Sequence, residues 1–132
     1  LRRASELDPS ATRPLEWLGD ISLELARVER AAEYFERYVA IDERSPRVLY
    51  KLGMARYRAG AAQDALSAVE RALRLDPQLR DAQFLRGLCQ RDLGQPREAR
   101  QTLEAVVAAM PGAAGPRQAL AEVYAALGDH QR

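Results

Sequence analysis

The sequence predicts an all-α protein, a solenoid of paired helices, because three kinds of residue recur with one period. The glycines Gly19, Gly53 and Gly87 stand 34 residues apart. An alanine follows each glycine by 12 residues, and a larger apolar residue follows each alanine by four. These residues are Ala31, Ala65 and Ala99, and Phe35, Val69 and Leu103. A sequence that repeats itself about every 20–50 residues indicates stacked structural units.

Turn and cap residues divide each period into two helices. Gly60 and Gly94 suit the left-handed conformation that ends a helix. The proline of Asp76-Pro77 ends another helix, because proline disfavours helical geometry at the residue before it. Proline also suits the first turn of a helix, where a missing N–H costs nothing, and we assign Pro14, Pro46 and Pro116 to such turns. The predicted helices lie near residues 1–7, 12–25, 28–41, 46–59, 62–75, 80–93, 96–109 and 114–127, with no strand.

The recurring glycines lie in the middle of predicted helices, where glycine costs about 1 kcal/mol relative to alanine. Three such costs at one phase need a physical reason, and close approach of the paired helix supplies it. Ala31, Ala65 and Ala99 are the matching small residues on that paired helix. We therefore expect each glycine to lie against the second helix of its own repeat.

The same residues follow the pattern of the tetratricopeptide repeats, which have an aromatic residue or leucine, Leu-Gly, Ala, an aromatic residue, Ala and Pro in that order. The second repeat offers Leu49, Leu52-Gly53, Tyr57, Gly60, Ala65, Val69, Ala72 and Asp76-Pro77. The chain resembles this family over nearly its whole length, as one domain spanning residues 1–132 with full repeats at 12–45, 46–79 and 80–113. Residues 1–11 match the end of a preceding repeat and residues 114–132 the first helix of a further one. We therefore expect a piece of a longer protein.

Some residues depart from the family pattern. The first repeat has Ala26 in place of a turn glycine, Tyr38 in place of a small residue and Glu43 in place of proline. The third repeat has Arg86 where the family has leucine. The resemblance implies a right-handed superhelix of antiparallel helix pairs, with the first helix of each pair lining a concave groove.

Three groups of candidate partner-binding residues occupy positions that, by this resemblance, face the groove. They are an apolar strip of Tyr50, Met54, Tyr57, Phe84 and Leu88, an acidic ridge of Glu16, Asp20 and Glu24, and the arginines Arg47, Arg58 and Arg91. Exposed apolar patches often mark binding sites, and tyrosine and methionine are favoured contact residues. The alternative for the strip is that its tyrosines, common at these positions in the family, only support neighbouring packing.

The acidic ridge also has two interpretations. Like charges four residues apart on an isolated helix cost roughly 0.2–0.5 kcal/mol per pair. Either nearby cations neutralise the ridge, or the carboxylates are left unpaired to meet a basic partner. The cations within reach are Arg13, Arg27, Arg47, Lys51 and Arg58. Some relatives grip the carboxylate of chaperone tails with basic groove residues, and Glu16 and Asp20 have the opposite sign at those positions, which excludes that clamp.

Composition narrows the classes of partner. The chain has 20 basic and 19 acidic residues, which argues against a broad nucleic-acid or membrane-binding surface. No apolar run is long enough to insert into a membrane, and one cysteine excludes an internal disulfide. We expect a soluble protein, cytoplasmic or periplasmic, with the compartment left open. The excess of arginine and alanine is typical of a genome of high GC content, and indicates a bacterial origin.

No catalytic constellation is present, and no cofactor is implied. Cys89 is expected to be a small buried hydrophobe, and it cannot form a metal site of the usual ligand count with the single histidine, His130. Trp17 is interpreted as a packing residue on the flank of its own helix. We predict a non-enzymatic protein–protein interaction scaffold that captures a peptide or a helix in the groove. The alternatives are a homo-oligomer built through the solenoid ends and a substrate-binding arm of a longer enzyme.

Overall fold

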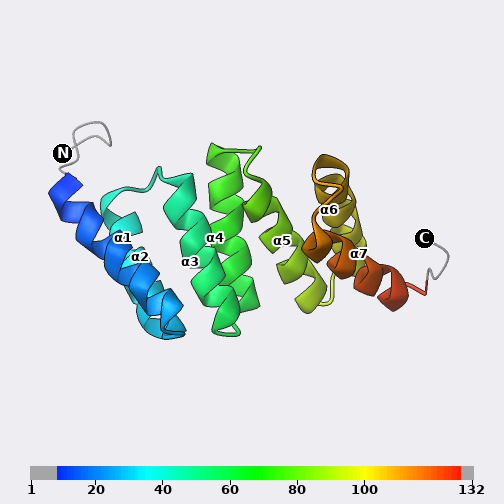
Figure 1. The fold of residues 1–132 in the computed structure, drawn as a ribbon, viewed down its shortest axis with the longest axis horizontal. Coiled ribbons are helices and arrows are strands. Elements are labelled where there is room, and N and C mark those ends of the chain that lie inside the picture. The colour runs from blue at the N-terminus through cyan, green and yellow to red at the C-terminus, as the bar shows by residue number, and fades with distance from the viewer. Residues whose placement is uncertain (1–8, 129–132) are drawn as a thin grey trace.

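The computed structural model describes residues 9–128, which form seven helices and no strand (Figure 1). The helices are α1 (Pro9–Glu24), α2 (Val28–Ile41), α3 (Pro46–Arg58), α4 (Ala62–Leu75), α5 (Arg80–Asp92), α6 (Pro96–Ala109) and α7 (Ala114–Ala126). Six of them both begin and end within one residue of their predicted bounds, and the all-α solenoid of helix pairs is confirmed. The helix expected near residues 1–7 lies outside the described residues.

One prediction about helix α1 is wrong. It begins at Pro9 rather than near residue 12, so Pro14 lies inside the helix and not in its first turn. Proline inside a helix removes one backbone hydrogen bond and strains the preceding turn. Pro46, by contrast, is at the start of α3 as expected, where Ser45 caps the helix by accepting a hydrogen bond from the Val48 N–H at 3.2 Å.

The turns between paired helices take the predicted left-handed conformation. Gly60 has φ of 86° and Gly94 has φ of 73°. Ala26 holds the same conformation in the first repeat, with φ of 60°, although it has a side chain that disfavours it. The fold therefore imposes this turn even where the favoured residue is missing.

The recurring glycines lie where paired helices meet, as expected. A Cβ added to Gly53 would lie 2.7 Å from Val69 Cγ2 and 3.3 Å from the backbone oxygen of Ala65. A Cβ added to Gly87 would lie 2.6 Å from Leu103 Cδ2. Both neighbours belong to the second helix of the same repeat, so a side chain at either glycine would push the pair apart.

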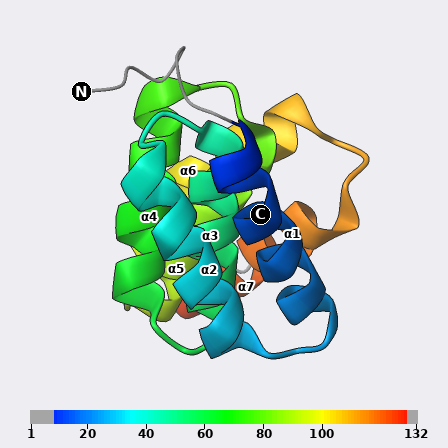
Figure 2. The same cartoon turned by 90° about the vertical axis from the view of Figure 1, so that its left-hand side faces the viewer.

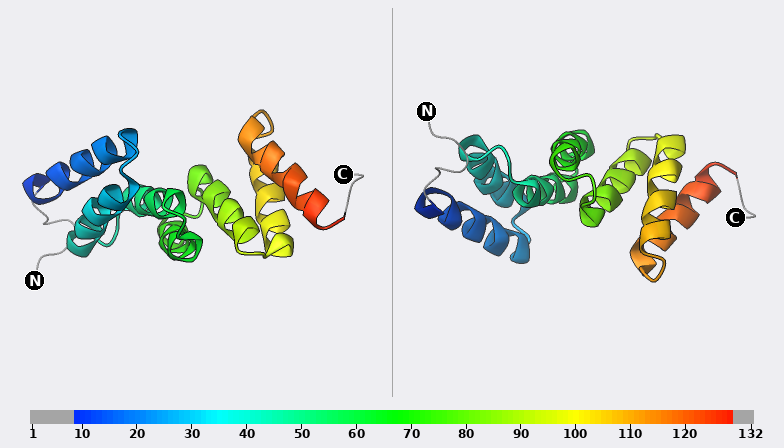
Figure 3. Two further views of the ribbon diagram at one scale, coloured as in Figure 1. Left: turned by 90° about the horizontal axis from the view of Figure 1, so that it is seen from below. Right: turned by 90° about the horizontal axis from the view of Figure 1, so that it is seen from above.

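The helices follow one another in a row from α1 at one end to α7 at the other (Figures 1 and 3). Figure 2 looks along this row from the end that carries α1 and α2. Each helix packs on the next one in sequence, and α5 also packs on α3 and α7. The buried apolar residues form two clusters, a large one between Ala31 and Cys89 and a small one between Ala99 and Val123. The partly buried Leu88 packs against both clusters.

Candidate functional site

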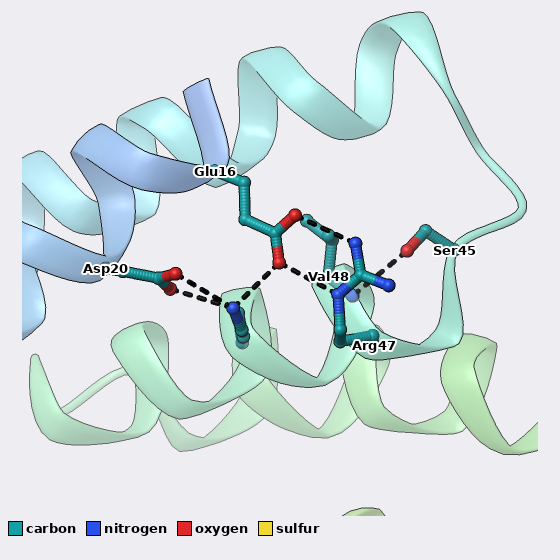
Figure 4. Close-up of polar contacts among 6 residues, drawn as sticks. Glu16, Asp20, Ser45, Arg47 and Val48 are labelled. Carbon is teal, nitrogen blue, oxygen red and sulfur yellow. Dashed lines mark hydrogen bonds and ion pairs between the residues drawn. The ribbon is translucent and has the colours of Figure 1, made fainter. Parts of the chain in front are cut away.

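The first helices of the repeats, α1, α3, α5 and α7, share polar contacts along one side of the row, which we call the first-helix face. At its α1 end, both oxygens of Glu16 accept hydrogen bonds from Arg47 Nε and Nη2, each at 2.8 Å (Figure 4). Lys51 Nζ lies 2.7 Å from Glu16 Oε2 and 2.9 Å from Asp20 Oδ1. Two carboxylates of α1 are thus held by two cations of α3.

These pairs are electrostatically coupled. The hydrogen bond from Arg47, followed by that from Lys51, lowers the pKa of Glu16 from 4.5 to about 2, although partial burial opposes this. Burial alone would lower the pKa of Lys51, but its hydrogen bonds to Glu16 and Asp20 outweigh that and raise it. Glu16 and Asp20 are therefore neutralised within the fold, as one of the two interpretations of the ridge expects. Glu24, the third member, is exposed and makes no ion pair within residues 9–128.

A second polar network joins α3, α5 and α7. The Tyr57 hydroxyl donates to Asp92 Oδ2 at 2.6 Å and accepts from Arg91 Nη2 at 3.1 Å. Arg91 also donates to Asp92 Oδ1 at 2.9 Å and to Glu122 Oε1 at 2.7 Å. Burial and the hydrogen bond to Asp92 raise the pKa of Tyr57 to about 12, so the phenol stays protonated and keeps its donor role. The network fixes the ring of Tyr57 in one orientation.

The five residues of the apolar strip are all half-buried. Tyr50, Met54 and Tyr57 pack against the large core cluster, and Phe84 packs against the small one. Phe84 also lies against α7, since its Cζ would be 3.3 Å from a Cβ on Gly115. Each side chain therefore buries one side in the fold and leaves the other for contact, which satisfies part of both interpretations of the strip.

Nine of the eleven candidate residues make polar or packing contacts within the fold, and two are left exposed. Arg58 and Glu24 are these two, and their side chains make no hydrogen bond or ion pair within residues 9–128. Sequence reasoning did not select Lys51, Asp92 and Glu122 as site residues, although all three bind selected ones. The one available signal was position, because Asp92 and Glu122 occupy groove-facing positions of the repeat.

Two expectations outside the face have clear outcomes. Trp17 is 65% exposed, so its interpretation as a packing residue is wrong. Cys89 is fully buried, as expected, and burial followed by the nearby carboxylates of Asp92 and Glu70 raises the pKa of its thiol to about 12. A thiol with that pKa is inert at neutral pH.

Antiparallel helix pairs stacked with a 34-residue period define a helical-repeat protein of the solenoid class. The family model that matches the chain, over residues 1–46 and 50–114, is described as tetratricopeptide repeat. The chain belongs to the tetratricopeptide-repeat family. A search of curated protein sequences finds no match.

Solved structures agree on the fold. The first tetratricopeptide domain of Spaghetti (RPAP3), bound to the HSP90 peptide SRMEEVD, matches with a TM-score of 0.87 at 20% identity, covering 92% of this chain and 97% of that one. The second such domain of human RPAP3, in complex with an HSP70 peptide, matches with a TM-score of 0.81 at 24% identity, covering 86% and 95%. MamA from Desulfovibrio magneticus RS-1 matches with a TM-score of 0.83 at 27% identity, covering 92% and 67%. No helix within residues 9–128 is long and apolar enough to cross a bilayer.

Proposed function

We propose that this chain is a non-catalytic protein–protein interaction scaffold that binds a peptide or a helix of a partner on the first-helix face. The observation that carries this proposal is the strip of half-buried aromatic and apolar side chains that spans α3 and α5, with Tyr57 locked by Arg91 and Asp92. Side chains already fixed by the fold lose little entropy when a partner binds. Two similar solved domains hold peptides of other proteins, which supports peptide binding here, although not through the same carboxylate clamp.

The charges of the first-helix face restrict the kind of partner that can bind there. Arg47 and Lys51 are paired with Glu16 and Asp20, so these cations are not free to hold a terminal carboxylate. We therefore expect the partner to be held by apolar anchors over the strip. The exposed Glu24 and Arg58 then add charge contacts at the edge of the face.

The test uses peptides selected from a displayed library on the wild-type protein, with affinities measured by fluorescence anisotropy. Tyr57→Ala and Phe84→Ala should each weaken binding by more than about 1 kcal/mol, the scale of an interface hot spot. Glu98→Ala and Gln101→Ala, at exposed positions of α6, are the matched controls and should change little. Equal losses from both pairs would show that the face is not the site.

Because Tyr57 and Phe84 also pack in the fold, a second pair of variants separates binding from stability. Glu24→Lys and Arg58→Glu alter exposed residues that make no ion pair within residues 9–128. They should leave the melting temperature unchanged and shift the affinity for charged peptides in opposite directions. No shift in either direction would place the partner elsewhere.

A further inference from the structure

A cleft lies away from the first-helix face, between α2 and α4, and α3 forms its floor. It consists of two adjoining hollows of about 280 and 240 Å³, which share Glu43 and Arg71. Val39 and Leu52 line the first hollow, and Leu49 and Leu75 line the second. The helices appear in this order, with α3 between the other two, in Figure 1.

The cleft has an excess of positive charge. Four arginines and two glutamates line it: Arg44, Arg56, Arg71 and Arg74, and Glu36 and Glu43. Arg56 pairs with Glu36 at 3.0 Å and donates to the Asp64 carbonyl at 3.2 Å, so these two charges are satisfied. Arg44, Arg71 and Arg74 form no ion pair within residues 9–128, and only Glu43 opposes them in the cleft. Three unpaired guanidinium groups around one hollow favour an anionic ligand.

The cleft also offers apolar contact at its edge, where Leu75 is 43% exposed. Leu49 and Leu52 close the floor, but they are 0% and 1% exposed and present almost no surface to a ligand. The floor residues from Leu49 to Arg56 extend about 10 Å along α3 at roughly 1.5 Å per helical residue. That length accommodates about three residues of an extended peptide at roughly 3.3 Å each.

This set of residues is not a general property of the repeat. One period later, Gln83 stands in the position of Leu49, Arg86 in that of Leu52, and Ala105 in that of Arg71. The apolar floor and the cationic wall therefore occur together at the second repeat and are not reproduced at the third.

We propose that the cleft between α2 and α4 binds a short acidic peptide segment that carries an apolar side chain. The apolar side chain enters the cleft against Leu75, and the flanking carboxylates contact Arg71, Arg74 and Arg44. This site is separate from the first-helix face, so the chain binds two partner segments at once.

The test uses a fluorescein-labelled synthetic peptide of alternating glutamate and leucine, titrated with the protein and followed by fluorescence anisotropy. Arg71→Glu combined with Arg74→Glu should weaken binding at least tenfold. The matched control, Arg97→Glu combined with Arg100→Glu on α6, makes the same change in net charge and should alter affinity less than twofold. Arg71→Gln combined with Arg74→Gln gives a milder loss of the same sign, and circular dichroism verifies that every variant is folded.

Two further binding experiments test whether the peptide binds in this cleft rather than on the first-helix face, and whether binding needs more than charge. Tyr57→Ala combined with Phe84→Ala should leave binding of this peptide unchanged, whereas it weakens peptides of the first-helix face. A peptide with alanine in place of leucine should bind at least fivefold more weakly, and one with lysine in place of glutamate should not bind. The proposal is overturned if the wild type does not bind the acidic peptide. It is also overturned if the Arg71/Arg74 and Arg97/Arg100 variants lose the same affinity for it, or if only the Tyr57/Phe84 variant loses affinity.

Discussion

Ala26 adopts a backbone conformation that its own side chain disfavours. It has φ of 60°, the conformation that Gly60 and Gly94 adopt at the same turn of the later repeats. A residue with a Cβ costs about 1–2 kcal/mol in this conformation relative to glycine. Part of the advantage of glycine is offset by its greater conformational freedom in the unfolded chain.

Ala26→Gly should therefore raise the free energy of unfolding by about 0.5–1 kcal/mol. Gly60→Ala, the reverse change one period later, should lower it by a similar amount, because no atom lies within 4 Å of an added Cβ and only the backbone conformation matters. Urea unfolding followed by circular dichroism measures both. Two changes of the same sign would contradict the argument.

Arg86 is a second residue that acts against the fold. Its Nε is buried without a hydrogen-bond partner within residues 9–128, and a buried donor left unpaired costs about 1–3 kcal/mol. The buried Leu52 occupies the same position one period earlier.

Arg86→Leu should therefore stabilise the protein by about 1 kcal/mol or more. Arg86→Lys is the informative partner, since it puts a methylene in place of Nε and keeps the positive charge. If thermal unfolding showed a gain for leucine but none for lysine, the charge and not the buried donor would be the cause.

The residue scale also shows what the sequence could predict. Periodicity identified Gly53, Gly87 and Ala65 because their role depends on backbone distance alone, which any repeat of this spacing shares. It failed for Trp17, because the exposure of that residue depends on what packs against α1 and not on its own helix. It left the ridge undecided for a similar reason, since the lengths and rotamers of Arg47 and Lys51 decide which carboxylates they reach.

At the scale of elements, replacing a glycine by alanine where two paired helices meet has two opposed effects on stability. Alanine in place of a mid-helix glycine gains about 1 kcal/mol of helix propensity. The Cβ on Gly53, however, would lie 2.7 Å from Val69 Cγ2 and 3.3 Å from a backbone oxygen that cannot move away. Overpacking of this kind costs about 1–3 kcal/mol and outweighs the gain.

Gly53→Ala should therefore lower stability by up to about 2 kcal/mol, and this cost should be smaller in a Val69→Ala background than in the wild type. Gly112→Ala is the control, because nothing lies within 4 Å of its added Cβ and its φ is not positive. Chemical denaturation of the single variants and of the double variant measures the differences. An unchanged Gly53→Ala would refute close approach as the reason for the glycine.

The junction of α1 and α3 gives stability that depends on pH. Arg47 and Lys51 lower the folded-state pKa of Glu16 to about 2 from its ordinary value of 4.5, so the contribution is complete above pH 4.5 and is lost as pH falls toward 2. Solvent screening at Arg47, whose side chain is 63% exposed, reduces its size to about 1 kcal/mol.

Glu16→Gln should accordingly be less stable than the wild type at pH 7 by about that amount. The two proteins should approach equal stability at pH 2, where the wild-type carboxyl takes up its proton. Urea titrations at a series of pH values test this. A stability difference that stayed constant with pH would mean that Glu16 contributes through packing and not through its charge.

At the scale of the whole molecule, the fold is a row in which every unit depends on its neighbours. Its helix order and helix bounds could be predicted from caps, prolines and periodicity, because these signals are local. The start of α1 was not predicted, since Pro14 resembles the first-turn prolines of the later repeats while α1 continues back to Pro9. The cleft between α2 and α4 was not predicted either, because it depends on side chains of three helices at once.

The division of the buried residues into two clusters governs how the row opens. Among residues 9–128, the large cluster contains 17 buried residues and the small one five, and α6 and α7 pack around the small one. Stability in a solenoid is close to a sum of local terms, so this end should open without the rest. Amide hydrogen exchange in α7 should be at least tenfold faster than in α3 and α4. Uniform exchange rates along the chain would show instead that the two clusters unfold as one.

Opening at that end has a consequence for partner capture. Leaving α7 free would break the contact between Glu122 and Arg91 and expose Phe84, whose ring lies against Gly115. A partner bound across α5 and α7 would then keep α7 packed against α5. The dwell time of the partner would then depend on how often α7 detaches, and the partner would in turn control how much of the row is ordered.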